Sequence, residues 1–433
     1  MTRVIVVGGG TAGAEAAKEA SRCGATVSLL EASGALGLDQ CLFPSLLSRR
    51  PATSALSTTP EELSDKFGVE VELGRRVRRV DFAAKTVHGD WVQDGPANRR
   101  YDSLVVATGA SSVPDEIKGS SKPGVWPLRS EADFLSLARA LPGLSNVSIV
   151  GSSALLALAV AQEVYRATRC RLFVSGGGLG ALSPGIRSRV VTDAASKGVA
   201  VVDAGVQAVV GMKRVEAVVA LDVVHPCDAV VLLPRSSPST PQLECARGVS
   251  GGIVVDGTMR SSQGGVFAAG DCAELRVGAG SVPFKVHSSA VTMGRTAGSN
   301  AAGGRVAQAA VAGTLALDLF GAQLCTAGLQ VTQGRAVGLN LVEMEEGSEP
   351  EGALKGSGFQ TSVIFERDSH HIYGLQARGE GAALLSGHIS MIVSAHSSLE
   401  EVAGQDSPGP FPSGSEVSPI CLTARKLLSR LRG

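Results

Sequence analysis

The chain has 433 residues, enough for two or three domains that each bury a core of their own. Its 40 basic and 40 acidic residues cancel to a formal net charge of zero, which argues against a dedicated nucleic-acid partner. The longest apolar run, Ala154–Ala161, is too short to span a membrane. The eight cysteines lack the paired spacing of a disulfide framework or a metal site. No secretory signal precedes the first predicted strand, so we expect a cytoplasmic protein.

The chain opens with a strand, a glycine-rich turn and a helix. We predict a buried parallel strand over Val4–Val7 and a helix over Ala14–Arg22. The turn between them carries the three glycines of a G-x-G-x-x-G sequence, Gly8, Gly10 and Gly13. Such glycines let the backbone approach a pyrophosphate that binds at the N-terminus of the following helix. This order of elements predicts a dinucleotide site.

An acidic residue and a cysteine follow this turn. A second strand is predicted over Thr26–Leu30, and Glu31 at its end is well placed to accept hydrogen bonds from a ribose hydroxyl. Cys41 lies ten residues beyond Glu31, and Pro44 follows it. A thiol close behind a nucleotide site suggests redox chemistry. The alternative is a buried structural cysteine, because free cysteines often fill cores, and we give the other cysteines only that interpretation.

The rest of the first unit contains a short capped helix over Thr59–Lys66 and strands over Val69–Leu73 and Val77–Phe82. A buried strand that ends in a tight glycine turn, Tyr101–Ala110, completes the unit. The segment Ser111–Pro127 is rich in Ser, Pro and Lys, so we interpret it as a linker.

A second strand-helix-strand pattern follows, with a strand over Val147–Val150 and a helix over Ala154–Ala167. Further strands are predicted over Arg171–Val174, Val199–Val202, Val206–Val210, Val215–Leu221 and Ala229–Leu233. Because this unit repeats the order of the first, we infer an internal duplication.

The chain then returns with strands over Gly251–Asp256 and Val266–Asp271 and a helix over Ser288–Ala302. The remainder mixes both element types, with strands over Leu339–Met344, Ser362–Glu366 and Ile372–Gln376 and helices over Gly381–Ala395 and Leu422–Leu431. The predicted fold class is α/β, with two doubly wound dinucleotide-binding-type domains and a C-terminal α+β domain.

These segments, in this order, resemble the pyridine nucleotide-disulfide oxidoreductase family over nearly the whole chain. The matching pieces are the first fingerprint with Glu31, the Ala107-Thr108-Gly109 turn, the Val266–Asp271 strand, the Met293-Gly294-Arg295 helix and the Gly313-Thr314 start of the last domain. The resemblance implies a discontinuous FAD domain of residues 1–113 and 250–305, an NAD(P)-binding-like domain of residues 114–249 and a dimerisation domain of residues 306–433. It therefore implies a homodimer.

The resemblance also implies which residues bind the FAD. Asp271 would hydrogen-bond the ribityl chain near the flavin phosphate, although an ordinary turn aspartate is the alternative. The helix after Pro283 would direct its positive end at the flavin pyrimidine. The implied FAD-binding residues are Gly8, Gly10, Thr11, Ala12, Gly13, Glu31, Val77, Ala107, Thr108, Gly109 and Asp271.

The spacing of Cys41 and Pro44 is similar to the single-cysteine branch of the family, which holds coenzyme A-disulfide reductases, NADH oxidases and peroxidases. Leu36 occupies the position where the two-cysteine branch has its partner thiol. A lone thiol beside a flavin can form a mixed disulfide with an outside disulfide or cycle through a sulfenic acid. The resemblance further implies Arg22 and Gln40 as substrate contacts.

The second fingerprint departs from the family's G-x-G-x-x-G-x-E sequence, which would begin at Gly151. Ser153 replaces the glycine that admits the pyrophosphate. Leu156 replaces the glycine that lets helix and strand pack closely, so we expect its side chain to push them apart. Leu158 stands where the family's glutamate faces the nicotinamide, and the next strand ends at Ser175 without an acid or an arginine. These changes predict weak or absent NAD(P)H binding.

A second glycine turn, formed by Gly176, Gly178 and Ala181, could replace the damaged one. We expect Pro184 and Gly185 to break the helix that such a turn requires, so we interpret this tract as a flexible loop.

Groups for proton transfer are also few. The two-cysteine branch has H-P-x-x-x-E near its C-terminus, whereas the nearest match here, Phe411–Glu416, begins with a phenylalanine that cannot transfer protons. Thr11 stands where the peroxidase relatives have a histidine. His396 is interpreted as part of a helix turn.

The leading hypothesis is an FAD-dependent thiol/disulfide oxidoreductase, similar to coenzyme A-disulfide reductases, in which Cys41 reacts with a disulfide, polysulfide or persulfide. Its electrons would come from a weakly bound nicotinamide or another donor. The second hypothesis is a catalytically weak flavin-binding paralogue that acts as a redox sensor or interaction partner. The sequence around Cys41 favours the enzyme, whereas the altered nicotinamide and proton-transfer positions favour the sensor.

Overall fold

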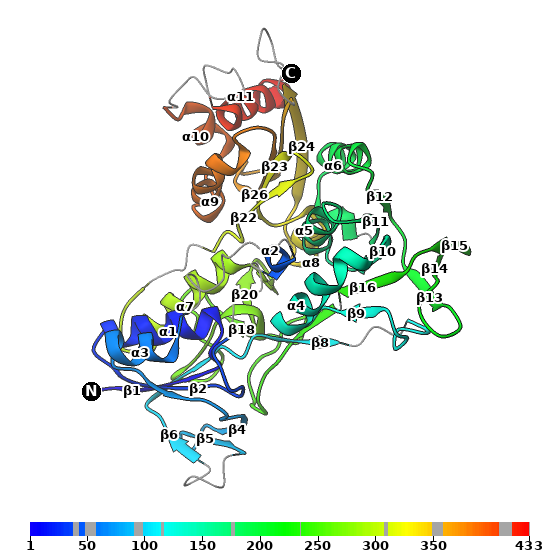
Figure 1. Cartoon of the computed structure of the whole chain (residues 1–433). Helices are drawn as coiled ribbons and strands as arrows, with labels where there is room; N and C mark the ends of the chain where they lie inside the picture. The colour runs from blue at the N-terminus through cyan, green and yellow to red at the C-terminus, as the bar shows by residue number, and fades with distance from the viewer. Residues whose placement is uncertain are drawn as a thin grey trace.

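The computed structural model describes residues 1–37, 43–47, 58–90, 98–113, 117–174, 178–233, 235–306, 311–348, 358–406 and 418–432. Three groups of elements are visible in Figure 1: blue and yellow-green elements around α1 and α7, cyan and green elements around α4 to α6, and orange and red elements around α9 to α11. No helix in the described part of the chain has the length and apolar character needed to cross a membrane.

The first group is built on a five-stranded parallel sheet. Its central strand β1 (Arg3–Val7) has β2 (Thr26–Leu30) and β3 (Glu70–Glu72) on one side. On the other side lie β7 (Ser103–Val106) and β19 (Val266–Ala268), so a segment from much later in the chain completes the sheet. The predicted return of the chain to the first unit is confirmed.

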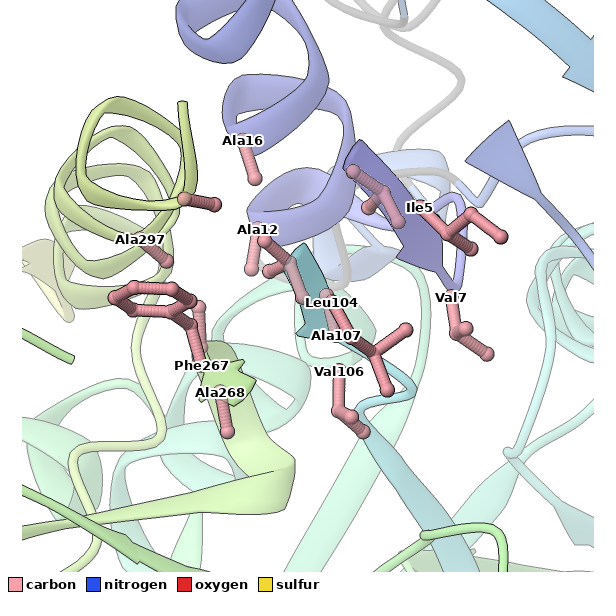
Figure 2. Packing of buried hydrophobic residues seen from close by; sticks show 14 of the residues in the cluster. Ile5, Val7, Ala12, Ala16, Leu104, Val106, Ala107, Phe267, Ala268 and Ala297 are labelled. Carbon is pink, nitrogen blue, oxygen red and sulfur yellow. The ribbon is translucent and has the colours of Figure 1, made fainter. Parts of the chain in front are cut away.

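Helices α1 (Thr11–Arg22) and α7 (His287–Ala301) pack closely against each other above this sheet. A Cβ atom at Gly294 would lie 2.3 Å from the carbonyl oxygen of Ala12, and one at Gly298 would lie 2.1 Å from that of Ala16. Side chains at these glycines would therefore force the helices apart. Figure 2 labels small residues on both helices, Ala12 and Ala16 on α1 and Ala297 on α7.

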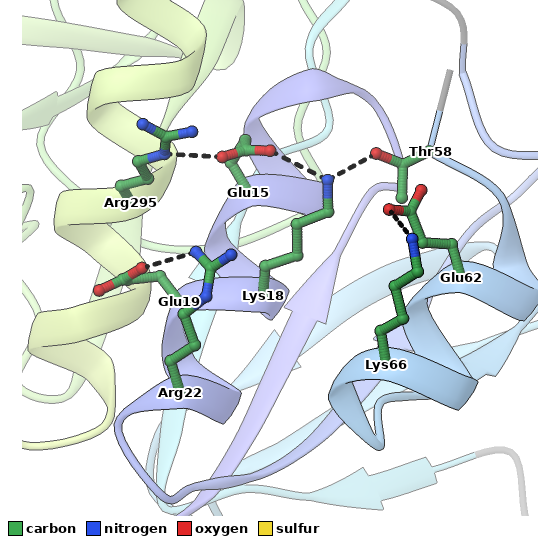
Figure 3. Close-up of polar contacts among 8 residues, drawn as sticks. All are labelled: Glu15, Lys18, Glu19, Arg22, Thr58, Glu62, Lys66 and Arg295. Carbon is green, nitrogen blue, oxygen red and sulfur yellow. Dashed lines mark hydrogen bonds and ion pairs between the residues drawn. The ribbon is translucent and has the colours of Figure 1, made fainter. Parts of the chain in front are cut away.

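A cluster of charged and polar side chains links α1 to α7 and to the segment before α3 (Pro60–Phe67) (Figure 3). The Glu15 carboxylate accepts from Arg295 Nε at 2.7 Å and from Lys18 Nζ at 3.1 Å, and Lys18 also donates to Thr58 Oγ1 at 2.8 Å. Burial alone would raise the pKa of Glu15, but these hydrogen bonds outweigh it and lower the pKa. Helix α3 begins just after this cluster, where the Thr59 side chain accepts from an N–H of its first turn, as the sequence predicts.

The second group also has a five-stranded parallel sheet, and four of its strands have the same order as β7, β1, β2 and β3. Strand β10 (Asn146–Gly151) is central, with β11 (Arg169–Val174) and β12 (Ala200–Val202) on one side. Strands β16 (Ala229–Leu233) and β9 (Val125–Pro127) lie on the other. The shared four-strand order agrees with the predicted internal duplication, whereas the fifth strand follows the other four along the chain in the first sheet and precedes them in the second.

Each of the first two groups also carries a three-stranded antiparallel sheet, inserted before β7 in the first group and before β16 in the second. These strands are β4 (Val77–Asp81), β5 (Thr86–Gly89) and β6 (Asn98–Arg100) in the first group, and β13 (Val206–Val210), β14 (Ala217–Ala220) and β15 (Val223–Pro226) in the second. A further small sheet joins β18 (Ile253–Val255), β20 (Ala273–Val277) and β21 (Gly280–Val282).

The prediction of a linker over Ser111–Pro127 is wrong at both ends. At its start, β8 (Ala110–Val113) pairs antiparallel with β17 (Arg235–Pro238), so the two chain crossings between the groups form a ribbon. At its end, β9 (Val125–Pro127) is an edge strand of the second sheet. Serine and proline suggest a loop, but proline is tolerated at a sheet edge because one side of that strand needs no N–H donor.

Three helices accompany the second sheet: α4 (Glu131–Ala140), α5 (Ala154–Val164) and α6 (Pro184–Ser196). The sequence predicts only α5. The expectation that Pro184 breaks a helix is wrong, because Pro184 is the first residue of α6, where its missing N–H costs nothing.

The C-terminal group is a five-stranded antiparallel sheet with helices, as predicted. In spatial order its strands are β22 (Leu315–Leu319), β23 (Ala322–Gly328), β26 (Ile372–Arg378), β25 (Phe359–Glu366) and β24 (Leu341–Ser348). Its helices are α8 (Val331–Ala336), α9 (Ser386–Ser394), α10 (Leu399–Gly404) and α11 (Pro419–Arg432). The predicted fold class is therefore confirmed, while the exact domain boundaries stay a prediction.

Polar contacts fix the second group against the C-terminal sheet. At the start of α6, Gly185 N donates to both carboxylate oxygens of Glu345 at 3.0 Å. Near the end of the same helix, Asp193 accepts from the buried guanidinium of Arg378. Two ends of one helix are thus held by the neighbouring domain.

Candidate functional site

A pocket opens at the carboxyl edge of the first sheet, where ligands of such sheets bind. It lies at the turns that follow β1, β7 and β19 and at the N-terminus of α7. Its lining consists of Gly10, Thr11, Ala12, Ala107, Gly109, Ala110, Ala269, Gly270, Asp271, Lys285, Val286, His287 and Ala290. Six of the predicted cofactor-binding residues are thereby brought together, namely Gly10, Thr11, Ala12, Ala107, Gly109 and Asp271.

The three fingerprint glycines have different roles in this pocket. Gly8 has φ +104°, and a Cβ there would lie 2.3 Å from the carbonyl oxygen of Ala107. A Cβ at Gly13 would lie 1.9 Å from the carbonyl oxygen of Gly8. A Cβ at Gly10, in contrast, has no neighbour within 4 Å and faces open space. Gly8 and Gly13 therefore permit close packing, whereas Gly10 leaves room for a ligand.

Two helix N-termini open onto the same pocket. Neither α1, after Gly10, nor α7, after Val286, has a side-chain cap or an acidic residue in its first turn. The N–H groups of a first helical turn and the positive helix end are suited to anionic oxygens such as those of a diphosphate. The pocket thus fits the diphosphate-containing FAD that the family fold implies.

Asp271 and Lys285 supply the charges of the pocket. Burial raises the pKa of Asp271, an effect that the positive charge of Lys285 opposes. The Asp271 carboxylate accepts no hydrogen bond from any residue in the described ranges, so it is free to bind ligand hydroxyls. Lys285 Nζ donates to the carbonyl oxygen of Ser236 at 3.2 Å. The sequence analysis did not identify Lys285 and His287. Lys285 lies two residues before α7 and His287 is its first residue, and α7 is the helix that the sequence assigned to the flavin.

The other predicted cofactor residues lie outside the lining of this pocket. Glu31 accepts from Gly9 N at 2.6 Å and from Ser33 N at 2.7 Å, which fixes its carboxylate at the end of β2. Thr108 donates its hydroxyl hydrogen to a backbone carbonyl, and Val77 is buried in the core of the first group. Their binding roles stay a prediction.

The predicted substrate contact Arg22 lies at the opposite end of α1 from the pocket. A helix of 12 residues is roughly 18 Å long, so the structure does not bring Arg22 to the pocket within one chain. Its guanidinium pairs with Glu19 at 3.2 Å and lies 5.0 Å from the ring centre of Phe67.

Cys41 and Gln40 lie outside the described residues, and so does the Phe411–Glu416 segment. The described chain on either side of Cys41 is anchored in two places. Gly37 N donates to the carbonyl oxygen of Gly9 at 3.1 Å, beside the pocket. Phe43, the first residue of α2 (Phe43–Leu46), packs on Phe134 with ring centres 5.1 Å apart, in the core of the second group.

Most of the other cysteines are buried and their thiols are difficult to ionise. Burial raises the pKa of Cys170 and Cys325 to about 12. Burial also raises the pKa of Cys227, Cys245 and Cys272. Since the thiolate is the reactive form, these positions agree with the predicted structural role. Cys23 is the exposed member of the described cysteines.

The second fingerprint differs from the sequence-based expectation in one respect. Leu156 is 36% exposed, whereas Ala157 is fully buried, and a Cβ at Gly151 would lie 3.5 Å from the Ala157 Cβ. The prediction that Leu156 pushes helix and strand apart is therefore wrong, because α5 turns an alanine toward the strand. Leu158 is fully buried in the second core. Ser153 is the N-cap residue of α5, but its side chain forms no capping hydrogen bond.

The tract after β11 (Arg169–Val174) is also more ordered than predicted where it is described. It forms a short 3₁₀ turn, Gly178–Ala181, before α6 (Pro184–Ser196). A Cβ at Gly178 would lie 2.9 Å from the carbonyl oxygen of Ser152, so this turn packs directly against the second fingerprint.

His396 lies in the turn after α9, as predicted. Its φ of +50° marks a left-handed turn residue, and its ring packs on Tyr373 with centres 4.6 Å apart. Burial lowers its pKa, which favours the neutral imidazole.

Residues 2–312 match the family model described as pyridine nucleotide-disulphide oxidoreductase. The chain is 26% identical over 393 residues to an NAD(P)H sulfur oxidoreductase (CoA-dependent) of Pyrococcus abyssi, covering 87% of each chain. It is 28% identical over 295 residues to a rubredoxin-NAD(+) reductase of Pseudomonas putida, covering 63% of this chain and 72% of the relative. Both names include a nicotinamide cofactor, so these relatives do not support the doubt about NAD(P)H.

Solved structures share the fold. An NAD-dependent persulfide reductase from A. fulgidus has a TM-score of 0.85 at 23% identity, covering all of this chain and 84% of that chain. A water-forming NADH oxidase from Lactobacillus brevis, bound to NADH, has a TM-score of 0.85 at 20% identity, covering 100% of this chain and 99% of that chain. The family match covers well over half of the sequence, and the chain therefore belongs to the FAD-dependent pyridine nucleotide-disulphide oxidoreductases.

Proposed function

We propose that this protein reduces a disulfide, polysulfide or persulfide, with FAD as its cofactor and Cys41 as its redox-active thiol. The observation that carries the FAD part is the pocket at which the N-termini of α1 and α7 open beside Asp271. The sulfur part is supported by similarity, over 87% of each chain, to a relative named NAD(P)H sulfur oxidoreductase (CoA-dependent).

Different residues of the pocket would bind different parts of the cofactor. The N–H groups after Gly10 and the N-terminus of α7 would hold the diphosphate and the flavin end, respectively. Asp271 would accept hydrogen bonds from the ribityl hydroxyls, and Glu31 would accept them from the adenosine ribose. When bound, FAD supplies the electron pair that returns a mixed disulfide to its thiols.

Cys41 would carry the sulfur exchange. Its thiolate attacks one sulfur of the substrate, a new bond forms between the two sulfur atoms, and the second substrate sulfur leaves as a thiolate. A place for Cys41 near the pocket is supported by Gly37, the last described residue before it, whose N–H is hydrogen-bonded to the first fingerprint turn.

For the second parallel sheet we propose NAD(P)H binding at the turn between β10 and α5, with an affinity weakened by Ser153. The close contact of Gly151 with Ala157 removes one of the obstacles that the sequence suggests. Replacing Ser153→Gly should lower the NADH concentration that half-reduces the flavin roughly tenfold, which corresponds to about 1.4 kcal/mol. The neighbouring Ser152→Gly exchange should leave that concentration unchanged and serves as the control.

We also propose a homodimer formed through the C-terminal domain. Leu384 and Met391, on the outside of that domain, are 79% and 70% exposed, which is a high value for large apolar side chains. A cytoplasmic location stays a prediction from the sequence.

The sulfur function can be tested by anaerobic reduction of the flavin with NADH, NADPH or a dithiol, followed by addition of coenzyme A disulfide or polysulfide. We expect the reduced flavin of the wild type and of Cys23→Ser to be reoxidised, and that of Cys41→Ser to stay reduced. Equal reoxidation of Cys41→Ser would contradict the role of Cys41. No reaction of the wild type with any donor or sulfur substrate would instead favour a redox sensor or interaction partner.

A further inference from the structure

A second cavity, of about 540 Å³, lies at the amino edge of the second parallel sheet. It is formed where β10, β11 and β12 begin and where α5 and α6 end, at Tyr165 and Lys197. Nucleotides bind at the opposite, carboxyl edge of such sheets, so this cavity is separate from both fingerprint turns. Its volume falls within the range of small-molecule sites.

The lining of this cavity is strongly basic. Arg166, Arg169, Arg171 and Lys197 all line it, and the lining residues that the structure describes include no acid. This is a local concentration of charge, since basic and acidic residues are equal in number over the whole chain. Arg166 is paired with Glu163 at 2.9 Å, whereas Arg169, Arg171 and Lys197 form no ion pair within the described ranges.

Part of this charge has a structural explanation. The C-terminal ends of α5 and α6 face the cavity, and each carries about half a negative charge that basic residues complement. Together these ends offset about one of the three unpaired cations, which leaves about two positive charges. The nearby Asp228 carboxylate lies outside the lining and accepts from the backbone N–H groups of Ser145 and Asn146.

Arg171 provides a second, independent observation. It extends from β11 beside Ser148 of β10, and its Nη1 is buried without a hydrogen-bond partner in the described structure. A buried guanidinium donor without an acceptor is costly, and native proteins rarely leave one unpaired. Arg171 also lines the cavity, so a small rotation of its guanidinium would bring this donor to a ligand oxygen there.

We propose that this cavity binds a small anion with two or more negative charges, of the phosphate-ester or diphosphate class. Arginine guanidinium groups bind phosphate oxygens with paired, charge-assisted hydrogen bonds, and Lys197 adds a further positive charge at the rim. The site goes beyond the redox function, because none of its residues belongs to the FAD pocket or to the second fingerprint.

The test uses FAD-loaded full-length protein, so that the first pocket is filled, and calorimetric titration with inorganic pyrophosphate. The double exchange Arg169→Gln and Lys197→Gln removes two exposed, unpaired cations and should leave the fold intact. We expect pyrophosphate binding to weaken at least about tenfold in this variant. Lys213→Gln, at an exposed lysine of the same domain outside the cavity lining, should bind like the wild type.

Further titrations identify the ligand and its place. Saturating NADH should leave pyrophosphate binding unchanged, because the two would occupy opposite edges of the sheet. Inorganic phosphate should bind more weakly than pyrophosphate, and a phosphate ester such as ADP should compete with it. Absence of pyrophosphate binding, equal binding by the double variant, equal loss in Lys213→Gln, or tighter binding of citrate than of pyrophosphate would each overturn the proposal.

Discussion

The two parallel sheets share the order of four strands but differ at the turn after the central strand. In the first, Gly13 of α1 touches the turn backbone, and Gly294 and Gly298 let α7 touch α1. In the second, an alanine of α5 packs on the turn and Leu158 fills the core beneath. The shared strands thus give both units the same scaffold. The size of the side chains in the first turn of the following helix sets how closely a dinucleotide can approach the backbone.

The units also differ in what fixes their helices. In the first unit, α1 and α7 are held by backbone contact and by the Glu15 cluster. In the second, α6 is held at both ends by the C-terminal sheet, through Glu345 and Arg378. The helix that holds α1 thus comes from a later segment of the same unit, whereas the contacts that hold α6 come from the C-terminal domain.

The largest expected effect concerns the buried leucine of the second unit. If Leu158 is core and not part of a nicotinamide pocket, Leu158→Glu should not restore the family's glutamate function. It should instead lower the free energy of unfolding by about 4 kcal/mol, because it buries a carboxylate and removes an apolar side chain.

The matched control is Leu156→Glu, two residues earlier in the same helix and partly exposed. It should cost less than about 1 kcal/mol in urea unfolding. Similar losses in both variants would mean that the register of α5 differs from the one described.

The next prediction separates packing from cofactor binding in the first unit. Gly13→Ala should lower the free energy of unfolding of flavin-free protein by about 3 kcal/mol, because the new Cβ would lie 1.9 Å from the Gly8 carbonyl oxygen. Gly10→Ala should leave that stability nearly unchanged but weaken FAD binding, since its Cβ would enter the open pocket.

Urea unfolding and flavin retention measure the two effects. If Gly10→Ala kept FAD as well as the wild type, the pocket would not be the cofactor site.

The smallest expected effect is a pH dependence at Asp271. Burial raises its pKa in the folded state above the unfolded value, so the folded protein binds the proton more tightly. Its contribution to stability is therefore present below the ordinary aspartate pKa, about 3.9, and is lost as pH rises through the raised value. The loss is at most about 1.4 kcal/mol per pH unit.

Asp271→Asn should abolish this loss in flavin-free protein and weaken FAD binding at neutral pH. The difference in unfolding free energy between the two proteins, measured from about pH 4 upward, should grow in favour of the variant. A difference independent of pH would show that Asp271 does not titrate in this range.

Much of the fold follows from local patterns in the sequence. The apolar run predicts the buried strand over residues 4–7, and the glycine spacing predicts the turn after it. Glu31 follows from its distance to that turn. The structure has the strand, the tight turn and Glu31 at the end of β2. The internal duplication is equally visible, since short apolar strands and a helix recur in the same order. Six of the residues predicted to bind FAD line one pocket because they follow parallel strands or begin the helix after the first strand.

Features that depend on distant partners escape such patterns. The β8–β17 ribbon pairs segments more than 100 residues apart, and serine and proline give no sign of it. Helix α6 begins at a proline, and Leu156 turns outward because packing at Ala157 sets the register of α5. Lys285 and His287 reach the pocket only because α7 returns to the first unit.

The central claim is that a thiol at Cys41 exchanges sulfur next to a flavin in the first pocket. The most direct measurement is peptide mass mapping of FAD-loaded protein after anaerobic exposure to coenzyme A disulfide. The account predicts one coenzyme A adduct, located on the Cys41 peptide, released by a dithiol and missing from Cys41→Ser. An adduct confined to Cys23, or none at all in fully flavin-loaded protein, would contradict it.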